Sequence, residues 1–330
     1  MSDQVPKSIR THSRLNYWRL AGTFFSFTLL FYLVWLQGWD ELAQAFRQLP
    51  LWIFFAAVGL ILASRVAITL RWHALLRSAG VKISIWQSLR LVFMGLFASN
   101  FLPSTVGGDL VRLAGSMYLH FDTGRIAASL LVDRLVGIAG MALLLPIGLS
   151  AILRIPIEVG TDPHSPVWPI IAGIAPCNQL KRLFYKGIAF CKRLLQSAAY
   201  WLRHPVSLGL PFLFTLCHMA LTFLAIAVLL AGLGEQTPFL LIGGLWSFSY
   251  FVSLAPFSIN GLGLQEISIV YLYTEFGGVS MQTALALAVL LRLLFLLSSL
   301  PGVLFLPDIL RPMPAINASD SPPAADQPLL

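Results

Sequence analysis

Charged residues are scarce in this chain of 330 residues: Asp, Glu, Lys and Arg make up 11% of it, and 57% of its residues are hydrophobic. Soluble domains carry about 25% charged residues. Apolar runs of about 20 residues recur along the chain, which is the length that a membrane-spanning helix needs. A soluble all-α protein with a large core is the alternative, and the composition argues against it. The sequence therefore predicts an all-α polytopic membrane protein.

Cysteine and histidine are too few and too scattered to form the usual metal sites. The three cysteines contain no CxxC, and the six histidines contain no HExxH. This excludes a disulfide framework and the common zinc motifs. No Walker A sequence is present, so no ATPase site in this chain is expected to drive transport. We expect no metal, no cofactor and no catalytic residue, and hence no enzyme.

The positive charges gather in particular loops. The net charge of +8 could indicate a nucleic-acid partner, but the basic residues lie between apolar segments, as the positive-inside rule describes. Suppose that both termini are cytoplasmic, that residues 100–112 and 256–266 belong to re-entrant segments, and that residues 167–176 cross the membrane despite their short length. The cytoplasmic segments then hold 16 Lys and Arg residues and the opposite side holds two. We expect a multi-pass protein of the bacterial inner (cell) membrane with cytoplasmic termini, and no nucleic-acid partner.

The chain divides into a basic N-terminus, one transmembrane domain of two halves, and a tail. These parts are a cytoplasmic N-terminus 1–19, the domain 20–307 with halves 20–177 and 206–307, a basic amphipathic linker 178–205, and a disordered tail 308–330. We expect about six to eight transmembrane helices in the domain. The predicted long helices are 20–36, 51–70, 125–153, 206–233, 238–254 and 284–306, with a short apolar segment at 167–176.

Two details of the first half bear on this count. A signal peptide is the alternative for 20–36, but its apolar core is too long and Trp35 and Trp39 resemble interfacial anchors. Arg65 lies in the last turns of the predicted helix 51–70, where it is expected to extend to the membrane surface. Residues 71–90 are then expected to form a basic connection.

The stretch Asn100-Phe-Leu-Pro-Ser-Thr-Val-Gly-Gly-Asp-Leu-Val-Arg112 interrupts one of the most apolar regions. Broken backbone at membrane depth is tolerated only where protein or a water-filled cavity covers it. Asp and Arg there are costly and indicate function by default. Apolar residues 91–102 are too few to span the membrane alone, and a short helix is expected at 109–119. We interpret the two pieces as a re-entrant pair.

A second stretch, Pro256-Phe-Ser-Ile-Asn-Gly-Leu-Gly-Leu-Gln-Glu266, repeats this design in the other half. In both, glycines precede a short helix that begins near a charged residue. Free N–H groups at a helix start form an anion site, in particular for phosphate. Two such breaks in corresponding positions are typical of a transporter binding site. Ordinary turns with helix caps, outside the membrane, are the alternative.

Further charged residues lie inside the predicted helices: Asp133, Arg134 and Arg292. The planar guanidinium suits a phosphodiester. A structural ion pair is the alternative, in which Asp133 or Glu266 neutralises an arginine between helices. The predicted substrate-binding residues are Asn100, Pro103, Ser104, Gly107, Gly108, Asp109, Arg112, Asp133, Arg134, Ser258, Gly261, Gly263, Glu266 and Arg292. His218 is expected to pack against a neighbour.

These motifs resemble a known family. The Gly-x-Gly-Asp pattern of intramembrane aspartyl proteases does not fit, because Val106 stands where the first glycine is required. Residues 100–112, 127–137, 256–266 and 284–302 are instead similar to the transmembrane region of lysylphosphatidylglycerol synthases, a flippase-like family. The resemblance implies movement of lipid between leaflets. The chain ends soon after its last predicted helix, so we expect it to lack the family's cytosolic aminoacyl-transfer domain and that activity.

Three functions follow as hypotheses. The leading one is a protein that binds an anionic lipid or a polyprenyl-phosphate head group and moves it between leaflets. The second is a non-catalytic partner that presents lipid to a separate glycosyltransferase or lipid-modifying enzyme. The third is an intramembrane enzyme that uses Asp109 or Glu266 as a base. The expected partner is an anionic membrane lipid, with a lipid-modifying enzyme as the second candidate.

Overall fold

The computed structural model describes residues 49–100, 107–154, 206–254 and 263–305, together with Arg47 and Gly261. Several predictions concern residues outside this part of the chain. They are the N-terminus 1–19, the helix 20–36, the segment 167–176, the linker 178–205, the tail 308–330, and the site residues Pro103, Ser104 and Ser258.

The described residues form α-helices and one 3-10 helix, with no strand among them. The helices are α3 (Leu51–Ser78), α4 (Ile85–Ser99), α5 (Gly107–Tyr118), α6 (Thr123–Arg154), α10 (Val206–Gly232), α11 (Phe239–Ser253), α12 (Leu264–Glu275), α13 (Met281–Ser299) and η1 (Leu300–Phe305). Four of these segments are long and apolar enough to cross a membrane: α3, α6, α10, and α13 together with η1. The chain is therefore an all-α, multi-pass membrane protein, as its composition predicts.

The two halves repeat the same order of long and short helices. In the first half α3, α4, α5 and α6 have 28, 15, 12 and 32 residues. In the second half α10, α11, α12 and α13 have 27, 15, 12 and 19 residues. A helix of 15 residues is about 22 Å long and cannot cross a hydrocarbon core of about 30 Å. Each half thus contains one pair of short helices between two long ones.

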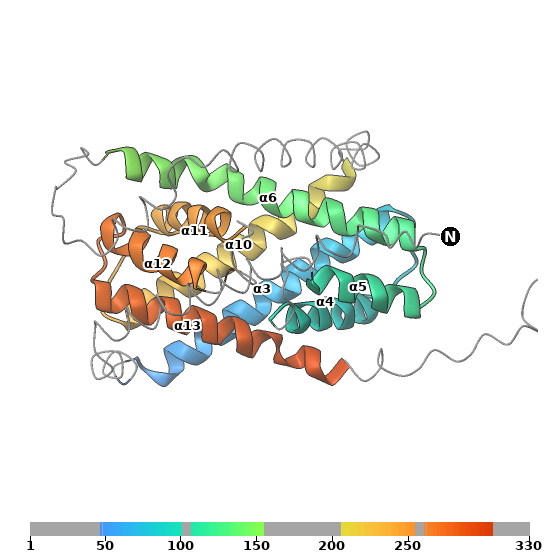
Figure 1. Ribbon diagram of the computed structural model, residues 1–330, viewed down its shortest axis with the longest axis horizontal. Coiled ribbons are helices and arrows are strands. Elements are labelled where there is room, and N and C mark those ends of the chain that lie inside the picture. Colours follow the sequence, from blue (N-terminus) through green and yellow to red (C-terminus); the bar gives the residue numbers. More distant parts are fainter. Residues whose placement is uncertain are drawn as a thin grey trace, which may run out of the picture.

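The packing of the helices follows this repeat. The corresponding helices α3 and α10 pack against each other along the middle of the domain. Around them, α6 packs on α11, while α13 and η1 pack on α4. Figure 1 shows the pair α4–α5 and the pair α11–α12 at opposite ends of the long axis, with α6 and α13 along the two sides. The short pairs of the two halves therefore approach the centre from opposite directions.

Local signals set the ends of these helices. The Ser84 hydroxyl accepts a hydrogen bond from the Gln87 N–H, and the Gln87 side chain accepts one from the Ser84 N–H, which forms a capping box at the start of α4. Ser280 caps α13 in a similar way by accepting from the Thr283 N–H. Gly80, with φ +77°, provides the left-handed turn after α3.

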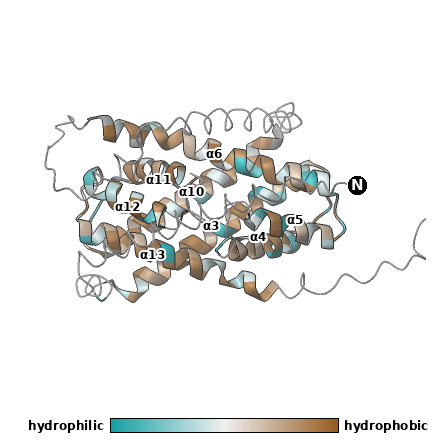
Figure 2. Ribbon diagram, viewed as in Figure 1, coloured by the Kyte–Doolittle hydropathy of each residue, from teal (hydrophilic) through white to brown (hydrophobic). Residues whose placement is uncertain are grey.

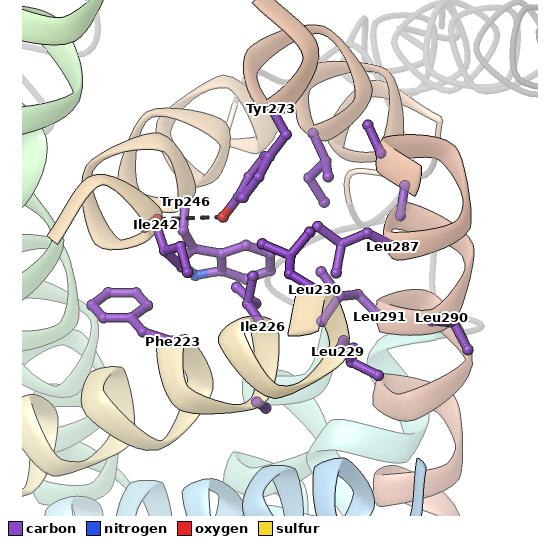
Figure 3. Close-up of a cluster of buried hydrophobic side chains, with 14 of the residues drawn as sticks. Phe223, Ile226, Leu229, Leu230, Ile242, Trp246, Tyr273, Leu287, Leu290 and Leu291 are labelled. Carbon is purple, nitrogen blue, oxygen red and sulfur yellow. Dashed lines mark hydrogen bonds between the residues drawn. The ribbon is translucent and has the colours of Figure 1, made fainter. Parts of the chain in front are cut away.

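The largest core cluster gathers where the two halves meet. Trp246 on α11 and Tyr273 on α12 lie beside leucine and isoleucine side chains of α10 and α13 (Figure 3). The Tyr273 hydroxyl donates to the Ile242 carbonyl at 3.3 Å, so its polar end is satisfied inside the cluster. Hydrophobic residues dominate the long helices, and a hydrophilic position interrupts α13 (Figure 2). This apolar packing fixes the helices that carry the charged residues described below.

The structure corrects the predicted boundaries of the first half. The helix expected at 51–70 continues to Ser78 as α3, and α4 begins at Ile85. Arg71 and Arg90 are therefore helical residues, and the basic connection between these helices is shorter than the predicted 71–90. Since Arg71 is buried, it does not contribute to the count of loop charges that sets the orientation. The remaining helix boundaries differ from the predicted ones by a few residues.

Candidate functional site

Asp133 on α6 binds two arginines from other helices. Arg71 Nε of α3 donates to Asp133 Oδ1 at 2.7 Å, and Arg112 Nη1 of α5 donates to Asp133 Oδ2 at 3.3 Å. All three side chains are buried. A buried carboxylate of this kind is stable only with such partners. Asp133 therefore ties α3, α5 and α6 together at one point.

A second carboxylate extends this chain of ion pairs. Asp109, in the first turn of α5, accepts from Arg112 Nη1 at 3.2 Å and also from Arg134 Nε of α6. Charges of opposite sign thus alternate along the network, which runs Arg71, Asp133, Arg112, Asp109, Arg134. Three arginines face two carboxylates, so the network keeps one positive charge in excess.

The second half contains a simpler pair. Glu266, in the first turn of α12, lies 3.5 Å from Arg292 Nη1 of α13 through its Oε1. Its Oε2 accepts a hydrogen bond from the Gly263 N–H at 2.7 Å. The Gly263 N–H at the start of α12 is thus occupied by a side chain of the same helix. The prediction of free N–H groups here is wrong for this one group.

Two cavities of about 280 Å³ each lie beside these ion pairs. The first cavity is lined by the Asp109–Arg112–Asp133–Arg134 network, and the second by Arg292, Asn100 and Gln265. They share the wall residues Arg65, Leu96, Ser99, Arg134, Met141, His218 and Tyr250. The cavities therefore adjoin at the centre of the molecule and connect the two halves.

Arg112 lines the first cavity and has donor nitrogens that no hydrogen bond uses. Its Nε and Nη2 are buried and make no hydrogen bond to the described residues. These two nitrogens form one edge of the guanidinium, the edge that grips two oxygens of a phosphate or carboxylate. The guanidinium carbon lies 4.1 Å from the centroid of the Trp72 ring, which supports the cation from one side. Arg112 thus lines the first cavity and keeps two buried donor nitrogens without a partner.

Close backbone contact between α4 and α5 holds Arg112 in this position. A Cβ added to Gly108 would lie 2.5 Å from the Gly95 carbonyl oxygen, and one added to Gly95 would lie 2.8 Å from Arg112 Cγ. Only glycine allows this approach. Small residues at such contacts are typical of helix pairs in membranes, where close packing supplies the association energy. The glycines of the first break therefore serve the packing of the short pair as well as its turn.

Eleven of the fourteen predicted site residues lie in the described part of the chain, and the structure distributes them unevenly. Gly108, Asp109, Arg112, Asp133 and Arg134 line the first cavity, and Asn100, Arg134 and Arg292 line the second. Asn100 Nδ2 donates to Ser299 Oγ at 2.8 Å, so it also joins α4 to α13. Gly107, Gly261, Gly263 and Glu266 line neither cavity, although Glu266 pairs with the lining residue Arg292. Gly261 and Gly263 have φ of +71° and +78°, the left-handed conformation that favours glycine.

Sequence reasoning missed several residues of the cavities. Arg65 does not extend to the membrane surface, because its Nε donates to Ser298 Oγ at 3.3 Å and its guanidinium lies over the Phe295 ring. The prediction that His218 packs against a neighbour is confirmed by its 2.6 Å hydrogen bond with the Ser64 hydroxyl, but the residue also lines both cavities. Arg71 was expected in a loop. Helix length was the available signal for Arg65 and Arg71, since the 28 residues of α3 place both arginines within the helix.

The described residues contain no group of three or more His, Cys, Asp and Glu side chains that could hold a metal ion. Every carboxylate of the site has an arginine partner. The chemistry that this arrangement offers is the binding of an anion by arginine, in a membrane domain with an apolar exterior.

The comparison with protein-family models agrees with this architecture. The model for the lysylphosphatidylglycerol synthase TM region matches residues 19–302. The chain belongs to this family. Membership of the lysylphosphatidylglycerol synthase TM region family makes it an integral membrane protein, in accord with its apolar helices. A search of curated proteins finds no match.

Proposed function

We propose that the protein binds the anionic head group of a membrane lipid in the two adjoining cavities and moves it between the leaflets. One observation carries this proposal: arginines outnumber carboxylates around the cavities among the described residues, and Arg112 has two nitrogens without a hydrogen-bond partner. Unpaired positive charge at membrane depth is costly. An anionic head group supplies the missing charge. The family, whose name refers to a lipid-modifying synthase, supports a lipid as the ligand.

The path of the head group follows from the repeat. In the proposal α4–α5 and α11–α12 are re-entrant pairs that enter from opposite faces, the first from the cytoplasmic side. Their lengths of 15 and 12 residues and their opposite positions in Figure 1 support this arrangement. A site between inverted halves near the midplane is the usual basis of alternating access. Each cavity would open toward one leaflet in turn, with Arg134 on the wall that both share.

The proposal includes an inner-membrane location with cytoplasmic termini and a role other than that of an enzyme. Asp109 and Glu266 were the candidate bases for a lipid-modifying reaction. Asp109 accepts hydrogen bonds from Arg112 and Arg134. Glu266 forms an ion pair with Arg292 and accepts a hydrogen bond from the Gly263 N–H. A base must reach a substrate proton. Because these contacts already occupy both carboxylates, they favour a structural role in which Asp109 and Glu266 hold the arginines in place.

The test is a scrambling assay with purified protein in vesicles that contain a fluorescent anionic lipid in one leaflet. Arg134→Ala is the variant of choice, because Arg134 lines both cavities and its side chain is 36% exposed, the most open of the ion-paired arginines. We expect this variant to insert and fold but to lose lipid movement. Arg125→Ala removes an exposed arginine from the same helix and is the matched control, with movement unchanged.

Movement at the wild-type rate in a folded Arg134→Ala protein would overturn the proposal. Binding of anionic lipid by the wild-type protein without any movement would instead favour presentation of lipid to a separate enzyme. Appearance of a new lipid species during the assay would favour an enzyme.

A further inference from the structure

The number of charges around the cavities indicates how many negative charges the ligand carries, as well as their sign. The lining residues and their ion-pair partners comprise five arginines and three carboxylates: Arg65, Arg71, Arg112, Arg134, Arg292, Asp109, Asp133 and Glu266. Among the residues that the structure describes, two positive charges remain in excess. His218, whose Nδ1 is hydrogen-bonded to the Ser64 hydroxyl, is left out of this count of formal charges.

The excess has two separate locations. One charge belongs to the network of the first cavity, where Arg112 has its free Nε and Nη2. The other belongs to Arg65. No carboxylate of the described residues lies within ion-pairing distance of Arg65, whose Nε donates to the neutral Ser298 hydroxyl and whose guanidinium carbon is 4.9 Å from the Phe295 ring centroid. Arg65 lies on the wall that the two cavities share.

Residues of the two breaks cannot neutralise this excess positive charge. Residues 101–106 and 255–260, which join the short helices of each pair, contain no Asp, Glu, Lys or Arg. In a medium of low dielectric constant, each uncompensated charge interacts strongly with any ion of opposite sign nearby. A head group with one negative charge would leave one positive charge unbalanced. A head group with two would neutralise both.

We propose, on the basis of the function proposed above, that the head group held in these cavities carries two negative charges, one near Arg112 and one near Arg65. An ionised phosphomonoester, a diphosphate and a pair of phosphodiesters share this chemistry. A single phosphodiester does not. Arg65 is then the residue that determines specificity for charge, because it holds the second negative charge without a carboxylate competing for it.

The experiment measures binding to the full-length protein in nanodiscs of phosphatidylcholine, with three added lipids compared at pH 8. These are phosphatidic acid, whose phosphomonoester can carry two negative charges, cardiolipin with two phosphodiesters, and phosphatidylglycerol with one. We expect the wild-type protein to bind at least one of the two-charge lipids about tenfold more tightly than phosphatidylglycerol. Preference for phosphatidic acid over cardiolipin would assign both charges to one phosphate.

Two variants of Arg65 distinguish the effect of its charge from a structural role of its side chain. Arg65→Gln should reduce the preference for two charges by about tenfold and leave the affinity for phosphatidylglycerol nearly unchanged. Arg65→Lys keeps the charge and should retain the preference, which a purely structural role of the guanidinium would not predict. Arg125→Gln, the same change at an exposed position of α6, is the matched control.

Two outcomes would overturn the inference: equal affinity of the wild-type protein for lipids of one and two charges, or an unchanged preference in a folded Arg65→Gln variant. Both leave the proposed binding of anionic lipid intact. Failure of all three anionic lipids to bind above the phosphatidylcholine background would instead overturn the proposed function, and the inference with it.

Discussion

Asp109 and Glu266 hold the same position in the two halves of the domain but bind different partners. Each is the third residue of a twelve-residue helix, and each pairs with the twelfth residue of the following helix, Arg134 or Arg292. Asp109 also binds Arg112, whereas Glu266 binds the Gly263 N–H. The repeat thus extends to single ion pairs, while the excess charge of the described residues lies in the first half, on the network of ion pairs and on Arg65.

This correspondence predicts that the two pairs hold their short helices in similar ways. In double-mutant cycles, Asp109→Asn with Arg134→Gln and Glu266→Gln with Arg292→Gln should each give coupling energies of about 0.5–3 kcal/mol in unfolding. Reversible unfolding of the purified protein in mixed micelles supplies the free energies. A cycle between the two pairs, Asp109→Asn with Arg292→Gln, is the control and should be additive. Coupling energies near zero within both pairs would contradict the prediction.

Asp133 is expected to be the most costly carboxylate to remove. Asp133→Asn leaves Arg71 and Arg112 buried without their shared counter-charge, so we expect a loss of stability of about 3–5 kcal/mol. The thermal unfolding temperature in detergent, followed by tryptophan fluorescence, would measure it. Asp122→Asn is the control, because Asp122 is exposed and accepts from the Arg125 N–H, a capping role that asparagine also fills. Equal unfolding temperatures for the two variants would refute this role of Asp133.

The contact between Gly95 and Gly108 predicts a strong effect of one methyl group. Gly108→Ala places a Cβ 2.5 Å from the Gly95 carbonyl oxygen, so α4 and α5 must separate. We expect a destabilisation of about 1–3 kcal/mol, together with slower lipid movement as Arg112 shifts. Gly59→Ala on α3 is the matched control, since nothing lies within 4 Å of its Cβ. Wild-type stability and movement in Gly108→Ala would show that this contact is dispensable.

The proposed orientation predicts which loops face the cytoplasm. Lys82 is an exposed residue between α3 and α4, and Gln236 is an exposed residue between α10 and α11. The C-terminal ends of α3 and α10, which these loops follow, lie at opposite ends of the long axis (Figure 1). In a background without the native cysteines, Lys82→Cys should react with an impermeant maleimide only after the inner membrane is opened. Gln236→Cys should react in cells whose inner membrane is intact. Labelling of both from the same side would contradict the proposed arrangement.

The sequence by itself determined the class of the protein and the location of the two breaks. Hydrophobic runs need only composition and length to be recognised, and the glycines and charges at 100–112 and 256–266 stand out against an apolar background. The alternative of a structural ion pair for Glu266 is also what the structure contains. The hydrophobic runs and the two breaks are local features, so neighbouring residues along the chain suffice to define them.

Only the tertiary structure decided which charges meet. Arg71 and Asp133 are 62 residues apart, and Arg65 and Ser298 are 233 apart. Both arginines lie close to the predicted end of a helix at Leu70, so their burial depended on the eight further residues that α3 gains and on the packing of α3 against α6, α10 and α13. Where two helices cross decides which charged residues meet. The crossing in turn depends on side-chain packing between helices that are far apart in the sequence.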